Sequence, residues 1–296
     1  MLSILIPIYN YNVTSLIETL QTQIEKVDID VEIICCDDAS TDQQLQAINY
    51  QFLTTHNLTY LKNATNIGRT KTRQLLSDSA QFNWLLFLDA DVIPVLPTFL
   101  ATYISFLSEK QECVYGGLSY SSKPPEKTYY FRWLYGHQRE DIPLNKRKLT
   151  PYKSIASGNL LIKKGLFTSI NKSILHNWYG YDNFFSAQLK ATNSSIKHIN
   201  NKVYHLGLED NSSFLKKQEL ATETIYELYK GKYFTSSHDN GLLKTYYKLK
   251  KYKLIWAYNC FYSIFKNRLK NNLLQSKPKL YYLDLYRLGY FCRLTQ

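Results

Sequence analysis

The stretch WLLFLDAD, residues 84–91, is a run of large apolar residues that ends in two aspartates. Such a run predicts a strand buried on both faces of a sheet. Asp89 and Asp91 have no packing role at its carboxyl end, which is where ligands bind in open α/β sheets. Two acids beside a turn suit either a divalent cation or a cap for the next helix. From this stretch alone, both interpretations remain open.

Three strand-and-helix pairs are expected before this stretch. Residues 2–8, 31–36 and 58–61 are expected to be strands. Apolar residues at helical spacing predict a helix over residues 13–24, and further helices are expected up to about residue 53 and from 69 to about 80. Ser40 or Thr41 is expected to cap the second helix. Four alternations of strand and helix predict a parallel, doubly wound sheet, in which the loops after the strands gather at one edge.

Polar residues follow each of these four strands, at 9–10, 37–38, 66–69 and 89–91. The predicted sheet brings these loops to the same edge, so this edge is the expected ligand site. The first strand is not followed by a GxGxxG pattern, which disfavours a classical dinucleotide site.

The second half of the chain is less regular. Residues 112–118, 156–162 and 196–206 predict strands, the last containing His198 and His205. The polar, basic and aromatic stretch between them, 119–153, is expected to be a substrate lid or partly disordered. We divide the chain into a main domain, residues 1–230, and a C-terminal helical extension, residues 231–296.

The formal charge of +12 is concentrated in the tail, because residues 241–296 contain 12 Lys and Arg, 13 aromatic residues and one acid. Basic, aromatic helices fit the interface of an anionic membrane. A helical subdomain with an aromatic core and solvated lysines explains the same composition, and these alternatives remain open. Nucleic-acid binding ranks last, because no RNA-binding motif is present.

The five cysteines form no CxxC pair, which favours a reducing compartment. No secretory signal and no apolar stretch long enough to span a membrane is apparent. We therefore expect a cytoplasmic protein, with the inner face of the cytoplasmic membrane as the place for any peripheral contact.

Seven short motifs follow one another along the chain: SILIPIYN (3–10), CDDASTD (36–42), NIGR (66–69), FLDAD (87–91), SGN (157–159), GYDN (180–183) and YHLGLEDN (204–211). In this order, and at the ends of the predicted strands, they resemble the family 2 glycosyltransferases. The resemblance covers roughly residues 1–230. It implies the GT-A fold, a mixed, mainly parallel sheet flanked by helices.

The resemblance implies a nucleotide site at the strand ends. Asp38 would accept a hydrogen bond from the base, uracil in a UDP-sugar, although Asp also caps helices. Pro7 and Tyr9 would line the base pocket, or simply pack at the end of their strand. The remaining implied contacts with the nucleotide are Asn66, Arg69, Asp89 and Ala90.

Asp91 resembles the metal-binding acid of the DxD motif, with Asp89 contacting the ribose or the metal. His205 resembles a third ligand, whereas His198 is expected to be a core or surface residue. The implied ion is Mn²⁺ or Mg²⁺, which would bridge the diphosphate and offset its charge. Imidazole suits Mn²⁺ better than Mg²⁺.

Asp182 is the best match to the catalytic base. Relatives carry a Glu-Asp pair at the start of a helix, and here Tyr181 replaces the Glu. One carboxylate within reach of the acceptor hydroxyl is enough for this chemistry. The alternative role of Asp182 is a helix N-cap.

We therefore predict a metal-dependent, inverting glycosyltransferase that moves a sugar from a UDP-sugar to a glycan or lipid-linked acceptor, in polysaccharide or surface-glycan synthesis. One rival is a sugar-nucleotide pyrophosphorylase, which should carry a Gly-rich basic loop after the first strand; residues 9–12, YNYN, are not such a loop. The other rival is a non-catalytic nucleotide-sugar-binding or membrane-associated scaffold.

Overall fold

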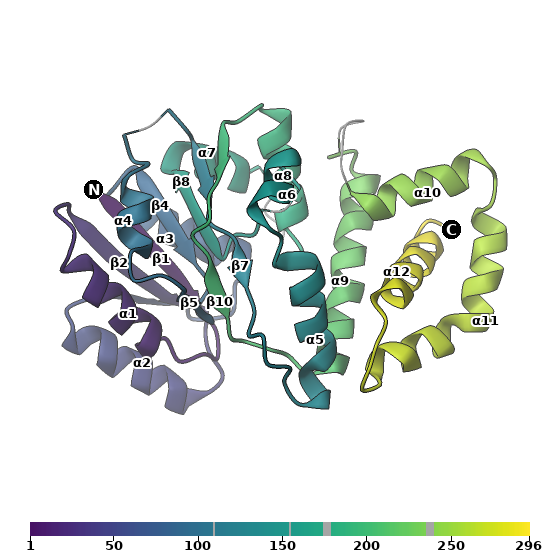
Figure 1. The fold of residues 1–296 in the computed structure, drawn as a ribbon, viewed down its shortest axis with the longest axis horizontal. Helices are drawn as coiled ribbons and strands as arrows, with labels where there is room; N and C mark the ends of the chain where they lie inside the picture. Colours follow the sequence, from purple (N-terminus) through teal and green to yellow (C-terminus); the bar gives the residue numbers. More distant parts are fainter. Residues whose placement is uncertain (109, 154, 174–178, 235–239) are drawn as a thin grey trace. The chain divides into compact units, whose positions relative to one another are not determined.

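The computed structural model describes residues 1–296 except 109, 154, 174–178 and 235–239 (Figure 1). The chain forms two compact units, and it passes between them more than once. The first unit comprises residues 1–120, 141–177 and 188–207, and the second comprises 121–140, 178–187 and 208–296. The division of the chain at residue 230 into a main domain and a C-terminal extension stays a prediction from the sequence.

The first unit is built on a seven-stranded sheet of order β3-β2-β1-β4-β8-β6-β9. Strands β1, β2, β3 and β4 are parallel, while β8 runs antiparallel to both β4 and β6. The strand bounds are β1 (Leu2–Ile8), β2 (Val31–Asp37), β3 (Thr59–Lys62), β4 (Trp84–Leu88), β6 (Cys113–Tyr115), β8 (Asn159–Lys163) and β9 (Ile196–His198). All five side chains of β4 are buried, as the opening apolar run predicts. The predicted mixed, mainly parallel α/β sheet is confirmed.

Helices alternate with these strands and cover the sheet. Helix α3 lies against β1 and α7, and α1 lies against α4. The bounds are α1 (Thr14–Ile24), α2 (Gln43–Thr55), α3 (Arg69–Ser79), α4 (Phe99–Ile104), α6 (Leu144–Leu149) and α7 (Lys164–Asn171).

The start of α2 differs from the prediction. Asp42 is the N-cap, and its carboxylate accepts hydrogen bonds from the backbone N–H groups of Gln44 and Leu45. Ser40 does not cap this helix: its hydroxyl oxygen accepts instead from the backbone N–H of Asn10, at 2.9 Å. The side chain of Ser40 therefore ties together the loops that follow β1 and β2.

A second, three-stranded sheet has the order β5-β10-β7 and comprises β5 (Val92–Pro94), β10 (Val203–His205) and β7 (Leu118–Ser119). Residues 196–206 thus form two strands in different sheets rather than one. The bend between them is fixed by Asn201, a buried residue whose amide donates to the backbone oxygen of Phe99 at 3.0 Å. In this sheet β10 runs antiparallel to β5 and His205 pairs with Val92, next to Asp91.

The stretch 119–153 is largely helical rather than disordered, with η1 (Lys127–Tyr129), α5 (Tyr130–Tyr135), η2 (Gly136–Glu140) and α6. Arg147 of α6 is almost fully buried, at 1% exposure. Its guanidinium group donates to the backbone oxygens of Ile142, Tyr115, Gly116 and Ile199 at 2.9–3.2 Å. This one side chain therefore pins α6 to the end of β6 and to the segment after β9.

The second unit is helical, with α9 (Asn211–Lys230), α10 (Gly241–Lys251), α11 (Ile255–Leu274) and α12 (Leu280–Leu294), together with α5 and the start of α8 (Asp182–Ala191). One core joins Phe131 of α5 and Phe214 of α9 to Tyr262 and Tyr286 of α11 and α12. A second core joins Ile225, Tyr246 and Phe291. The tail is helical, as predicted, and part of its aromatic content is core. None of the described helices is long and apolar enough to cross a membrane.

Replacing Arg147 by Met is expected to lower the free energy of unfolding by about 3 kcal/mol, because it leaves buried carbonyl groups without donors. The matched control is Arg139→Met. It removes the same charge from a half-exposed ion pair with Asp284 and should cost less than about 1 kcal/mol. Urea denaturation measures both, and equal losses in the two variants would contradict this role for Arg147.

Candidate functional site

The loops after β1 and β2 meet at the carboxyl edge of the parallel strands. The side-chain oxygen of Asn10, after β1, accepts from the backbone N–H groups of Thr41 and Asp42, after β2, at 2.8 and 3.1 Å. The side-chain amide of Asn10 donates to the hydroxyl of Thr41 at 2.9 Å. These bonds fix the two loops against each other, as expected of neighbouring parallel strands.

Asp38 joins the loops after β2 and β3. Its side chain is buried, and its carboxylate accepts from the side-chain amide of Asn63 and from the backbone N–H groups of Ile67 and Gly68, at 2.8–2.9 Å. The structure therefore gives Asp38 a role that the sequence did not suggest. It fixes the residues that lead into α3, which begins at Arg69.

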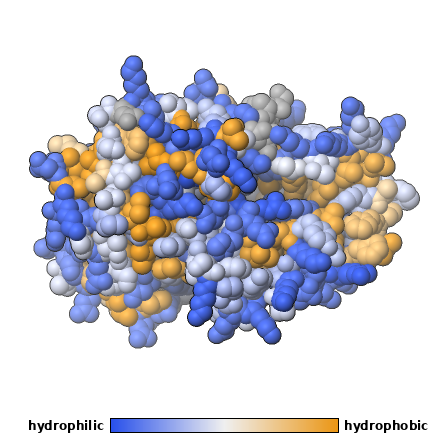
Figure 2. Space-filling model, viewed as in Figure 1, coloured by the Kyte–Doolittle hydropathy of each residue, from blue (hydrophilic) through white to orange (hydrophobic). Residues whose placement is uncertain are grey.

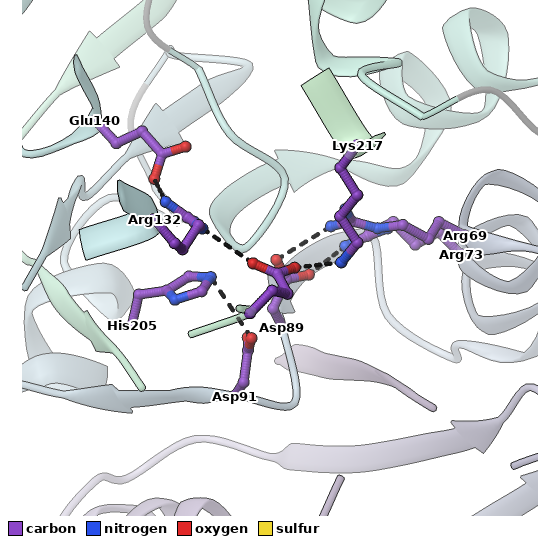
Figure 3. Close-up of polar contacts among 9 residues, drawn as sticks. Arg69, Arg73, Asp89, Asp91, Arg132, Glu140, His205 and Lys217 are labelled. Carbon is purple, nitrogen blue, oxygen red and sulfur yellow. Dashed lines mark hydrogen bonds and ion pairs between the residues drawn. The ribbon is translucent and has the colours of Figure 1, made fainter. Parts of the chain in front are cut away.

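Asp89 is held by two arginines from the first turns of α3 (Figure 3). Arg69 lies 3.3 Å from one carboxylate oxygen with its side chain half exposed, and Arg73, which is buried, contacts the other oxygen. Burial alone would raise the pKa of Asp89, but the charges of Arg73, Arg69 and His205 lower it below its usual range. The carboxylate is therefore held in its ionised form. Sequence reasoning found Arg69 and missed Arg73, although spacing of four residues places both on one helix face.

Asp91 faces His205 in the same unit, as Figure 3 shows. The Oδ2 atom of Asp91 lies 3.5 Å from Nε2 of His205, and both side chains are mostly buried. The imidazole stacks on the ring of Tyr120, with centroids 5.4 Å apart. Burial and the charge of Asp91 raise the pKa of the Tyr11 phenol, a residue to which the sequence analysis gave no role.

The pair Asp91 and His205 fits a divalent metal. One carboxylate oxygen and one imidazole nitrogen face each other, and this mixed donor set suits a transition-metal ion such as Mn²⁺. Among the described residues, no group of three His, Cys, Asp or Glu side chains gathers around a common point. The protein thus offers a partial ligand set, which other oxygen donors would have to complete.

Two glycines make room for the two acids. A Cβ atom on Gly207 would overlap the carboxylate of Asp91, and one on Gly158 would lie 2.5 Å from an oxygen of Asp89. A real Cβ atom does not come that close to an oxygen, so any larger residue would push the carboxylates away. The motifs SGN and YHLGLEDN therefore include their glycines for a steric reason.

The other predicted residues lie as follows. Pro7 is in β1, Tyr9 is half exposed directly after it, and Asn66 is exposed in the loop before α3. Ala90 is buried between the two acids. His198 is a core residue, as expected: it is buried, and its Nε2 lies 2.7 Å from the backbone oxygen of Pro151.

Asp182 is the first residue of α8 and belongs to the second unit. Burial and the charge of Asp182 raise the pKa of the neighbouring Tyr181 phenol, so Tyr181 stays neutral. Position 181, where the resemblance implies an acid, thus carries an uncharged aromatic side chain.

The motif YHLGLEDN continues into the second unit. There, Glu209 is bound by Arg132, at 3.2 Å, and by Lys217 (Figure 3). Arg132 is buried and also pairs with Glu140 at 3.0 Å. Asp210 caps α9 by accepting from the backbone N–H groups of Ser212 and Ser213. This part of the motif thus fixes the start of α9.

A sequence profile described as "Glycosyl transferase family 2" matches residues 3–177, more than half of the chain. The chain belongs to this family. A curated relative from Haemophilus influenzae, described as an "Uncharacterized glycosyltransferase", is 34% identical over 93 residues, which are 31% of this chain and 29% of the relative. The match thus spans less than a third of that relative. The family predicted from the sequence is confirmed.

Solved structures of glycosyltransferases share the fold of this family member. The mannosyltransferase PcManGT from Pyrobaculum calidifontis, solved with GDP-Man and Mn²⁺, has a TM-score of 0.53 at 12% identity over 77% of this chain and 64% of its own. Glucosyl-3-phosphoglycerate synthase from Mycobacterium tuberculosis, solved with Mn²⁺, UDP and glucosyl-3-phosphoglycerate, has a TM-score of 0.52 at 16% identity, covering 80% of this chain and 81% of its own. S. aureus TarS residues 1–349, solved with UDP-GlcNAc, has a TM-score of 0.50 at 18% identity, covering 100% and 92%. These likenesses confirm the GT-A fold.

Replacing Gly207 by Ala is expected to weaken the binding of a nucleoside diphosphate with Mn²⁺ at least tenfold, because the added methyl group displaces the Asp91 carboxylate. The melting temperature should change little. Gly165→Ala is the control, because nothing lies within 4 Å of the Cβ position there. Isothermal titration measures the binding, and wild-type affinity in Gly207→Ala would contradict the geometry.

Proposed function

We propose that this protein transfers a sugar from a UDP-sugar to a hydroxyl group of a glycan or lipid-linked acceptor, with inversion and with a divalent metal. The observation that carries the proposal is that Asp91 faces His205 two residues after the arginine-bound Asp89, at the carboxyl end of β4 in a family 2 chain. We place this reaction in polysaccharide or surface-glycan synthesis on the cytoplasmic side of the membrane.

Asp38 is proposed to recognise the base. Its carboxylate accepts three hydrogen bonds from the protein, and an ionised carboxylate offers about four acceptor sites. One site is thus left for a donor such as the N3–H group of uracil. Pro7 near the end of β1, Tyr9 directly after this strand and Asn66 in the loop before α3 would line the base.

Arg69, Asp89 and Ala90 are proposed to contact the ribose and the diphosphate. Asp89 orients two guanidinium groups, and the half-exposed side chain of Arg69 would turn toward an anionic ligand. A planar guanidinium matches the oxygens of a phosphate. The missed residue Arg73 would act by holding Asp89 in place.

Asp91 and His205 are proposed to hold the metal. Asp89 stands two residues away as a further oxygen donor, but both its oxygens face arginines, which makes it the weaker candidate. When bound, Mn²⁺ or Mg²⁺ would neutralise charge on the diphosphate. The structural neighbours solved with Mn²⁺ support the choice of ion.

Asp182 is proposed as the general base. It takes the proton of the acceptor hydroxyl while that oxygen attacks the anomeric carbon. The bond between this carbon and the diphosphate oxygen breaks in the same step, so the configuration inverts. Asp182 is the acid that remains at the GYDN motif, and it lies in the first turn of α8.

Two rivals remain as outcomes of the test. A pyrophosphorylase would need a basic, glycine-rich loop after β1, and the chain has YNYN there. A non-catalytic scaffold would bind the nucleotide sugar without turnover. Because one structural neighbour was solved with GDP-Man, donors of both nucleotides belong in the experiment.

With Mn²⁺ and a panel of UDP- and GDP-sugars, we expect release of UDP from one donor when glycan and lipid-linked acceptors are offered. Asp182→Asn should lower kcat at least 100-fold and leave UDP affinity within about threefold, whereas the exposed control Asp28→Asn should change neither. UDP binding without turnover on any donor, or full activity in Asp182→Asn, would refute the catalytic proposal.

A further inference from the structure

The corner between α10 and α11, together with the outer face of α11, exposes large apolar side chains. Tyr252 is 65% exposed, Leu254 is 47% exposed, and both Trp256 and Ile264 are 74% exposed. Figure 2 shows hydrophobic side chains mixed with hydrophilic ones at the right-hand edge of the molecule, where Figure 1 draws these two helices. We name the surface formed by these four residues, with the exposed Cys260, the apolar corner.

The apolar corner is separate from the core of its own unit. Buried Tyr262, Leu269 and Leu273 form the inner face of α11 and pack in the aromatic core with α12. Trp256, Cys260 and Ile264 recur every fourth residue on the outer face. The aromatic and apolar residues of the tail therefore fall into two groups. Tyr262 and Tyr286 pack in the core, whereas packing does not explain the exposed Trp256 and Ile264.

Two lysines neighbour Tyr252 in the apolar corner. Lys251 at the end of α10 and Lys253 in the turn after it are exposed, and the ammonium group of Lys251 lies 5.8 Å from the ring centre of Tyr252. Residues 241–296 as a whole carry 12 Lys and Arg and one acid. A surface with this excess of positive charge repels cations and attracts an anionic partner.

The turn itself is fixed. Lys253 has a φ of 57°, a left-handed backbone conformation that glycine or asparagine usually adopts at the end of a helix. The backbone N–H groups of Lys253 and Leu254 close the end of α10 by donating to Lys250 and Leu249, at 3.1 and 2.9 Å. Leu254 and Trp256 are thus presented by an ordered turn.

We propose that the apolar corner docks on the surface of an anionic phospholipid membrane. Aromatic and aliphatic side chains that project between lysines match an interface with apolar chains below and anionic head groups above. A second copy of this chain would bring two strongly basic surfaces together, so charge favours the lipid. The inference does not depend on the proposed transferase activity.

The cysteines allow a direct test. Cys260 is exposed at the apolar corner, and the other four cysteines are buried. An environment-sensitive dye on Cys260 of the full-length protein should shift to the blue with vesicles containing phosphatidylglycerol. It should shift little with pure phosphatidylcholine, and the shift should fade at high salt. An unchanged dye spectrum with the anionic vesicles would overturn the proposal.

Vesicle co-sedimentation of variants separates the contributions. Trp256→Ser with Ile264→Ser should lower binding at least tenfold, and Lys251→Gln with Lys253→Gln should lower it severalfold. The matched controls replace exposed residues of the first unit. Tyr50→Ser with Leu149→Ser is the control for the apolar pair, and Lys26→Gln with Lys110→Gln is the control for the lysine pair. Both controls should bind vesicles as wild type does.

Vesicle binding that is unchanged in Trp256→Ser with Ile264→Ser would overturn the proposal. So would self-association that these substitutions abolish without vesicle binding, which would assign the surface to a second copy. The assay contains no sugar donor, so its failure is distinct from failure of the transferase. UDP release with a soluble acceptor should be the same in this variant and in wild type.

Discussion

The pairing of β10 with β5 is the constraint on which the candidate site depends. His205 and Asp91 are far apart in the sequence, and the antiparallel register places His205 opposite Val92. The backbone N–H of Leu206 donates to the backbone oxygen of Asp91 at 2.8 Å, which locks the two segments together. The next residue is Gly207, where any side chain would displace the Asp91 carboxylate. Three consecutive residues thus supply the imidazole (His205), the backbone hydrogen bond to Asp91 (Leu206) and the room for its carboxylate (Gly207).

The charges at this edge are compensated in separate ways. Asp89 is neutralised by the guanidinium groups of Arg69 and Arg73, whereas Asp91 faces an imidazole. A mostly buried carboxylate needs such a partner, because desolvation otherwise favours its neutral form. The two acids of one short motif therefore have different surroundings. Asp89 binds two arginines, whereas Asp91 lies beside the imidazole of His205, a group that can also bind a metal.

The sequence predicts the parallel half of the fold well, because β1, β2 and β4 are mainly apolar runs followed by polar residues. The sequence does not predict how distant segments pair with one another. The apolar pattern of residues 196–206 cannot show that β9 and β10 join different sheets, since the bend depends on the buried amide of Asn201. The same holds for residues 119–153, which depend on the carbonyl contacts of Arg147 rather than on periodicity.

The site residues also divide into those that a local sequence pattern predicts and those that only a contact in the structure reveals. Acids at strand ends were visible as a pattern, whereas Arg73 became evident only from its contact with Asp89. The central claim is that Asp91 and His205 form the protein's share of a metal site. Anomalous diffraction from crystals grown with UDP and Mn²⁺ measures this directly. The account predicts a manganese peak bound by the Asp91 carboxylate and Nε2 of His205. A peak bound by other side chains, with these two still facing each other, would contradict it.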